Sequence, residues 1–243
     1  MIKFVIPAFN EAENISKVLQ KIEKLMKRMN KNYALIVIDD GSTDNTKQLL
    51  KGFKKNMYLI SHEKNKGVAE VFKTAFNSIE PKLKENDLVV TLEADLTSDL
   101  KDLPEMIAKA EQGADVVLAS CYAPGGSIKN ISFERRFLST GANTLMKMVF
   151  PMQGIHTYSS FFRVYRGSAI KKAIKNYGKH LIEEEGFTCV VELLIKMNRL
   201  GLRFAEVPTT LDLSVRKGRS KMNVPKTIAA YLKLIHRYAW KRG

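Results

Sequence analysis

Three short apolar runs, at residues 3–6, 34–38 and 88–92, are each followed closely by carboxylates, and this pattern constrains the fold most strongly. Apolar runs of this length suit strands that are buried on both faces of a parallel sheet. Unpaired carboxylates are costly to bury. We therefore expect the acidic residues to lie at the rim of the sheet, just outside its core.

Helical patterns separate these runs. Apolar side chains recur at helical spacing from Ile15 to Met29, and further helices are expected after Asp44 and from Val68 and Leu103. This alternation predicts an α/β fold, a mostly parallel central sheet flanked by helices. Right-handed crossovers bring the loops that follow the strands to one rim, where open α/β sheets bind ligands. We expect segments 7–11, 39–44 and 93–97 to meet there.

The pattern changes after Ser120. The remaining elements that we predict are a helix at 133–150, a strand at 158–166, a helix ending near 200, a strand at 203–207 and a tail helix at 224–240. There is no convincing linker or internal repeat. We expect one domain, residues 1–223, followed by an amphipathic C-terminal helix, residues 224–243.

The chain is strongly basic. Its net charge is +15 over 243 residues, with a pI near 9.7. This charge implies an anionic partner, namely nucleic acid, a membrane surface or phosphorylated substrates. Cys121 and Cys189 have no metal-like spacing, and two unpaired cysteines suit a reduced, cytosolic compartment. No apolar run approaches the ~20 residues that span a bilayer, so we expect any membrane contact to be peripheral.

Two parts of the sequence suggest the chemistry. The carboxylates of Glu93-Ala94-Asp95 are hard oxygen ligands that suit Mg²⁺ or Mn²⁺, and such a metal can bridge substrate phosphates. A basic, glycine-containing segment at 216–221 suits an anion. The chain has neither the G-x-x-x-x-G-K-[ST] loop nor a G-x-G-x-x-G after its first strand. Kinase, GTPase and dinucleotide-dehydrogenase functions are therefore disfavoured.

Four successive motifs resemble those of family-two inverting glycosyltransferases with the GT-A fold. They are Pro7-Ala8-Phe9-Asn10-Glu11, Asp39-Asp40-Gly41-Ser42-Thr43-Asp44, Asn65-Lys66-Gly67 and Glu93-Ala94-Asp95. Later motifs narrow the resemblance to dolichol-phosphate mannosyltransferases and related polyprenyl-phosphate sugar transferases. These are Arg135 with Ser139, Ser160-Phe161-Phe162-Arg163, Glu206-Val207-Pro208 and Gly218-Arg219-Ser220-Lys221.

The resemblance implies a nucleotide-sugar donor, a polyprenyl-phosphate acceptor and a role for each matching residue. The residues that would hold the nucleoside are Pro7, Phe9, Glu11, Asp39 and Asp40, and Ala94 would lie in the donor site. Asp95 would bind the metal, and Glu93 would contact the metal or the donor sugar. The acceptor phosphate would be bound by Arg135 and Ser139, and the residues that would close over the phosphates are Arg216, Ser220 and Lys221. The lipid phosphate would attack the anomeric carbon and invert it. Since a phosphate is already anionic, this attack needs no strong base.

Several residues depart from the family pattern. Glu93 stands where the family usually has Asp, Thr97 where it has Gln, Phe9 where it has Tyr, and Cys121 where it has Arg. The arginine before the Gly-x-Ser-Lys motif, Arg216, lies one residue closer than usual.

The expected function is metal-dependent transfer of a hexose, with mannose favoured, at the cytosolic face of a membrane. The tail helix would lie on anionic lipid; the plainer alternative is that this helix packs on the domain. A membrane-protein partner is also possible.

Several alternatives to this function stay open. A saccharide or protein acceptor would need a base, for which Glu183, Glu184 and Glu185 are candidates, although such a run is usually solvated. A catalytically inactive sugar-nucleotide-binding protein and a nucleic-acid binder are further alternatives, the latter without a recognisable motif. Arg163 suits an ion pair or the active site, and His156 suits a structural role.

Overall fold

The computed structural model describes residues 1–53, 55–215 and 224–239, with side chains described from residue 227 in the last segment. A seven-stranded sheet has the order β3-β2-β1-β4-β7-β5-β8. Its strands are β1 (Ile2–Ala8), β2 (Tyr33–Asp39), β3 (Met57–Ser61), β4 (Leu88–Thr91), β5 (Val116–Ser120), β7 (Arg163–Arg166) and β8 (Phe204–Pro208). All neighbouring pairs are parallel except those of β7, which runs antiparallel to β4 and β5. The predicted α/β fold is confirmed.

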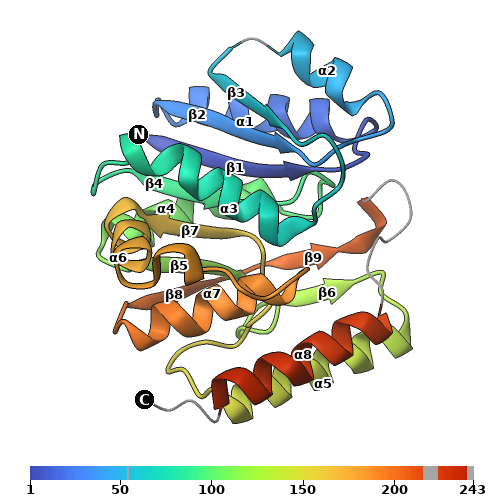
Figure 1. Ribbon diagram of the computed structural model, residues 1–243, viewed down its shortest axis with the longest axis vertical. Helices are drawn as coiled ribbons and strands as arrows, with labels where there is room; N and C mark the ends of the chain where they lie inside the picture. Colours follow the sequence, from blue (N-terminus) through green and yellow to red (C-terminus); the bar gives the residue numbers. More distant parts are fainter. Residues whose placement is uncertain (54, 216–223, 240–243) are drawn as a thin grey trace.

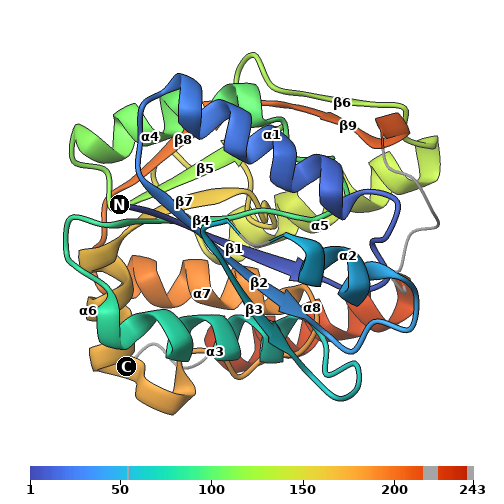
Figure 2. The ribbon, with the colours of Figure 1, turned by 90° about the horizontal axis from the view of Figure 1, so that it is seen from above.

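Helices cover both faces of this sheet (Figure 2). One face carries α1 (Ile15–Arg28), α2 (Thr46–Gly52) and α4 (Leu103–Glu111), and the other carries α3 (Val68–Ile79), α6 (Gly167–Tyr177) and α7 (Thr188–Arg199). In β1, Phe4 and Ile6 pack toward α1 whereas Val5 packs toward α3, and all three are fully buried. This burial on both faces explains the continuous apolar runs of the sequence.

Two long helices lie side by side below the sheet in Figure 1, and both begin on the side where β1 and β2 end. They are α5 (Phe133–Val149) and α8 (Val224–Ala239). Met146 is the one buried residue of α5, whereas Leu234 and Tyr238 bury α8 against the domain. Within the described segments, no helix is both long enough and apolar enough to cross a bilayer.

The local structure differs from the expectations in four respects. The strand expected at 158–166 shortens to β7, and the residues before it bond to the neighbouring strands in another way: the Thr91 hydroxyl of β4, for example, donates to the Phe161 carbonyl. Strand β1 extends past the apolar run 3–6 and through Pro7, since pairing with β4 stops at Val5 and the missing N–H of Pro7 costs no bond there.

Helix α6 and a parallel pair of three-residue strands, β6 (Ser127–Lys129) and β9 (Thr210–Asp212), were not expected. The helix expected after Asp44 is α2, and it has Asn45 at its N-cap.

Candidate active site at the carboxyl edge of the sheet

Glu93-Ala94-Asp95 directly follows β4, and the turn after it fixes both carboxylates. Asp95 is buried, and its Oδ1 accepts hydrogen bonds from the Thr97 amide at 3.2 Å and the Thr97 hydroxyl at 2.5 Å. Glu93 Oε2 accepts one from the Ser98 hydroxyl at 2.6 Å. Leu96, which follows Asp95, has a φ of 69°, and this backbone conformation is strained for a residue with a branched side chain. A strained turn held by side-chain bonds is typical of a functional site.

These residues fit a divalent cation that is shared with a substrate diphosphate. Carboxylate oxygens are hard ligands, and Mg²⁺ is commonly held by one or two carboxylates together with substrate phosphates. Over the described ranges, no three His, Cys, Asp or Glu side chains gather as a metal site. The structure thus offers the carboxylate pair that such a shared cation uses.

The two aspartates at the end of β2 have different partners. Asp40 Oδ1 accepts hydrogen bonds from His62 Nδ1 and the Lys66 amide, and its Oδ2 accepts one from the Gly67 amide just before α3. Asp39 Oδ1 accepts one from the Ser42 amide, but its buried Oδ2 has no hydrogen-bond partner among the described residues. Asp40 therefore joins two loops, whereas Asp39 keeps an acceptor that a ligand could use.

The loops after β1 and β2 are tied to each other. Asn10 Oδ1 accepts hydrogen bonds from the Thr43 and Asp44 amides, and the Asn10 amide donates to the Ser42 hydroxyl. The Glu11 amide donates to the Thr46 hydroxyl. These bonds place the half-exposed Pro7 and Phe9 beside Asp39 at the edge of the sheet.

The first eight residues of the predicted site therefore meet at one edge. They are Pro7, Phe9, Glu11, Asp39, Asp40, Glu93, Ala94 and Asp95. The strand ends come in the order β2-β1-β4. Asp39 ends β2 and Glu93 follows β4, and these two strands are about 10 Å apart because β1 lies between them. Arg216, Ser220 and Lys221 lie outside the described residues.

The predicted acceptor residues lie on α5, beside the loop that follows β5. Arg135 is exposed and Ser139 half-buried, one turn apart on one side of the helix. The Ser139 hydroxyl accepts a hydrogen bond from the Tyr122 hydroxyl at 2.8 Å. Thr157 joins this region to the sheet, because its hydroxyl bonds Ser120 at the end of β5 at 2.7 Å. Burial raises the pKa of the neighbouring Cys121 thiol to about 11, so the thiol is protonated at neutral pH.

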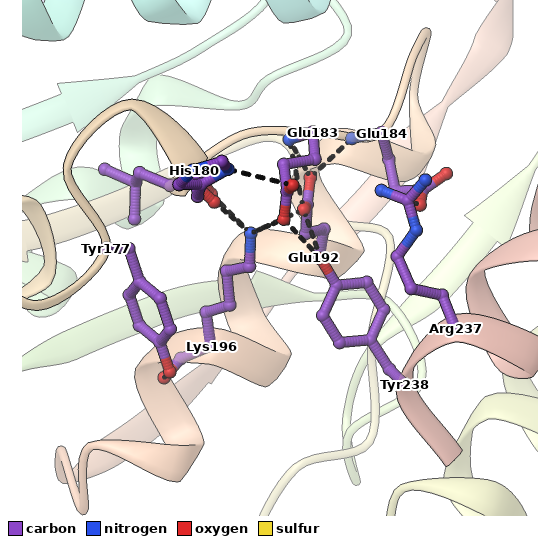
Figure 3. Close-up of polar contacts among 9 residues, drawn as sticks. Tyr177, His180, Glu183, Glu184, Glu192, Lys196, Arg237 and Tyr238 are labelled. Carbon is purple, nitrogen blue, oxygen red and sulfur yellow. Dashed lines mark hydrogen bonds and ion pairs between the residues drawn. The ribbon is translucent and has the colours of Figure 1, made fainter. Parts of the chain in front are cut away.

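The acidic run 183–185 is only partly solvated: Glu183 and Glu185 are exposed, as expected, whereas Glu184 is buried. Figure 3 shows that the buried Glu192 carboxylate accepts hydrogen bonds from the Glu183 and Glu184 amides, the Lys196 ammonium and the Tyr238 hydroxyl. The Glu183 carboxylate itself pairs with Lys196. Although burial acts to raise the pKa of Glu183, the hydrogen bonds and charges of Lys196 and His180 together outweigh it and lower the pKa.

Glu184 is also part of this cluster. Its carboxyl is buried and lies 3.1 Å from the Arg237 guanidinium of α8. Burial raises the pKa of Glu184 despite that arginine. Together with the Tyr238–Glu192 bond, this contact fastens the end of α8 to the 181–187 loop. Glu183 and Glu184 thus help to dock α8.

Arg163 is fully buried, and its guanidinium donates to the carbonyls of Val190 and Tyr158. It therefore has a structural role, and its partners are carbonyl oxygens where an ion pair with a carboxylate was expected.

The sequence analysis assigned no role to Tyr122, Thr157 or Glu192. A lone tyrosine or threonine in a loop carries no periodic signal, but Glu192 could have been found as a charge inside the apolar pattern of α7.

The family model for glycosyl transferase family 2 matches residues 3–174, most of the chain. The chain belongs to this family. Dolichol-phosphate mannosyltransferase of Pyrococcus furiosus is 28% identical over 97% of this family 2 chain and 63% of its own length. The undecaprenyl-phosphate 4-deoxy-4-formamido-L-arabinose transferases of Proteus mirabilis and Edwardsiella ictaluri are 29% and 27% identical, over 68% and 93% of the chain and 48% and 64% of their own lengths. The family 2 chain thus spans about half to two thirds of these relatives.

This family 2 protein has the same fold as a solved structure. The solved structure is that of glucosyl-3-phosphoglycerate synthase from Mycobacterium tuberculosis in complex with Mn²⁺ and UDP-glucose. The TM-score is 0.66 at 20% identity, over 97% of this chain and 76% of the other. The GT-A fold expected from the sequence is thereby confirmed, as is the resemblance to polyprenyl-phosphate sugar transferases by the curated relatives.

Proposed function

We propose that this protein transfers a hexose, with mannose favoured, from a nucleoside-diphosphate sugar to the phosphate of a polyprenyl lipid, with inversion at the anomeric carbon. The observation that carries the proposal is the carboxyl edge of the sheet. A carboxylate pair after β4 and a buried acceptor oxygen on Asp39 at the end of β2 lie there, on either side of β1. Helix α5, which carries Arg135 and Ser139, begins on the same side of the molecule (Figure 1).

In this proposal each set of residues does one task. Asp39 and Phe9 hold the nucleoside, Glu93 and Asp95 hold Mg²⁺ or Mn²⁺, and the bound metal offsets the charge of the departing nucleoside diphosphate. Arg135 and Ser139 orient the acceptor phosphate toward the anomeric carbon. Because the attacking phosphate oxygen is already anionic, catalysis is mainly positioning and charge stabilisation.

The pairing of Glu183 and Glu184 argues against either of them as the base for a hydroxyl acceptor; the third residue of the run, Glu185, is exposed. Such an acceptor needs a nearby base. The Glu183 carboxylate is paired with Lys196, and Glu184 lies buried against Arg237. Both of these carboxylates are already engaged by a cation, so the phosphate acceptor, which needs no base, is favoured.

A membrane surface is part of the proposal, because exposed apolar side chains are concentrated on the adjacent helices α5 and α8. They are Phe133, Phe137, Leu138 and Met148 on α5, and Ile228 and Leu232 on α8. Phe133 and Phe137 are 83% and 70% exposed. Arginines 135 and 136 lie between them, as suits an interface with anionic lipid.

The test is turnover with GDP-mannose, UDP-glucose and UDP-GlcNAc, each with Mn²⁺ and a short polyprenyl phosphate. We expect one donor to yield lipid-linked sugar and EDTA to abolish the reaction. Donor hydrolysis without lipid product would contradict the acceptor class, and activity that survives EDTA would contradict the metal.

A further inference from the structure

His156 is held by a buried carboxylate in a way that leaves one ring nitrogen for a ligand. Glu206, in the middle of β8, has a side chain that is 5% exposed. Its Oε1 accepts hydrogen bonds from the amides of His156 and Thr157, both at 2.8 Å, and its Oε2 contacts His156 Nδ1 at 2.8 Å. Because a carboxylate only accepts, Nδ1 must carry a proton, which fixes the tautomer and the ring orientation.

The other ring nitrogen of His156 is available. The side chain is 36% exposed, and Nε2 makes no hydrogen bond to any residue in the described part of the chain. A fixed imidazole with one nitrogen toward solvent is more than packing requires, since the two amide bonds to Glu206 already hold the loop.

The backbone of the 156–158 loop is bonded to α5, the helix that carries Arg135 and Ser139. Asn143, one turn after Ser139, donates to the His156 carbonyl at 2.6 Å and accepts from the Tyr158 amide at 3.0 Å. The Tyr122 amide contacts the Thr157 hydroxyl at 3.3 Å, and the Tyr122 hydroxyl bonds Ser139. These bonds connect α5, the loop after β5 and the 156–158 loop to one another, so His156 belongs to the same cluster of loops as Ser139.

An imidazole in this place suits a phosphate monoester in both of its ionised forms. The second pKa of such a phosphate is about 6, so its monoanion and its dianion are both present near neutral pH, and an imidazole has a form that can bond to either. Neutral Nε2 accepts the proton of the monoanion, and the imidazolium donates to the dianion. The nearby guanidinium of Arg135 favours an anion over a neutral hydroxyl compound.

We propose that His156 is a third ligand of the acceptor phosphate, beside Arg135 and Ser139, and that Glu206 holds its ring so that Nε2 meets a phosphate oxygen. This inference rests on the proposed function. Arg135 supplies permanent charge, Ser139 a short neutral donor, and His156 a group that matches the protonation state of the phosphate.

The kinetic test compares His156→Ala and His156→Gln with a matched control. His180 makes the same kind of pair, Nδ1 to Glu183 at 3.1 Å, on a loop away from α5, so His180→Gln is that control. We expect both His156 variants to raise the KM for farnesyl phosphate by about tenfold, and to leave the donor KM within about twofold. His180→Gln should change neither. An unchanged acceptor KM in folded His156 variants would overturn the proposal.

A direct test uses the ring signals of the four histidines, His62, His156, His180 and His236, in NMR spectra of the whole protein. We expect farnesyl phosphate to shift the His156 signals alone, inorganic phosphate to shift them at higher concentration, and farnesol to leave them unmoved. A response to farnesol but not to phosphate would assign the site to the lipid chain and overturn the proposal.

The two measurements separate the inference from the proposed function. Transfer to farnesyl phosphate with unmoved His156 signals would refute the role of His156 and support the proposed reaction. A His156 response without transfer from any donor would support the phosphate site and refute the reaction. Neither transfer nor response would refute both.

Discussion

The Tyr122 hydroxyl donates a 2.8 Å hydrogen bond to the Ser139 hydroxyl, joining the loop after β5 to α5. This bond orients the oxygen that we propose for the acceptor phosphate. Tyr122→Phe should therefore raise the acceptor KM about three- to tenfold, the range expected for one hydrogen bond. Steady-state kinetics in both substrates would measure this, with Tyr58→Phe, an exposed tyrosine on β3, as the control. A change confined to the donor KM would contradict the assignment.

Arg135 and Arg136 are neighbours with different surroundings. The Arg136 guanidinium donates to the Ile128 carbonyl, whereas Arg135 lies in line with Ser139. Arg135→Ala should raise the acceptor KM at least about tenfold, because a charged hydrogen bond to phosphate is lost, and donor affinity should hardly change. Arg136→Ala serves as the matched control. Equal effects of both variants would point to general charge attraction in place of a specific contact.

Asp95 should be needed for turnover. Asp95→Asn keeps the shape but removes the charge that binds the metal, so we expect kcat/KM to fall more than about 100-fold. Asp99→Asn is the control from the same loop, since Asp99 is the N-cap of residues 100–102 and accepts from the Lys101 amide. Isothermal titration with Mn²⁺ and donor would check the cause. Near-normal turnover by Asp95→Asn would refute the metal site.

Asp87 should make stability depend on pH at the opposite edge of the sheet. Burial acts to raise the pKa of Asp87, but bonds to Lys3, the Lys84 amide and the N-terminal ammonium lower it from 3.8 to about 2. Since the folded-state pKa is depressed, the carboxylate stabilises the fold above about pH 4, and this contribution is lost as the pH falls toward 2.

Asp87→Asn should therefore lower the free energy of unfolding at pH 7 by at least about 2 kcal/mol, because a shift of one pKa unit is worth 1.36 kcal/mol. Urea denaturation at several pH values would measure the difference between variant and wild type. The difference should shrink below pH 4; one that persists unchanged at pH 2.5 would contradict the role of the ionised carboxylate.

The apolar faces of α5 and α8 should bind anionic vesicles. Replacing Phe133 and Phe137 together by Ser should weaken vesicle binding at least about tenfold, given the apolar area that each ring can bury. Liposome flotation would measure it. Tyr58→Ser, which removes a 65% exposed aromatic side chain from the edge strand β3, is the control. Wild-type protein that stays unbound, or a double variant that floats equally well, would refute the membrane surface.

Much of the proposed donor site at the carboxyl edge of the sheet could be predicted from the sequence. The apolar runs specify buried strands, crossover handedness sends the following loops to one rim, and Glu93, Asp95 and Asp39 lie within a few residues of those strand ends. Local sequence and topology act in the same direction here. The family motifs added the fold and the class of reaction.

Only the tertiary structure decided which carboxylate oxygens already accept hydrogen bonds within the protein and which remain available to a ligand. Asp39 and Asp40 are adjacent and chemically identical, yet only the position of the 62–67 loop determines that Asp40 is saturated and Asp39 Oδ2 is not. Glu206 and His156 are separated by 50 residues, and Glu183 meets Tyr238 through Glu192. Such pairings depend on how strands and helices pack, which no local periodicity encodes, because a buried charge is stable only where distant donors converge on it.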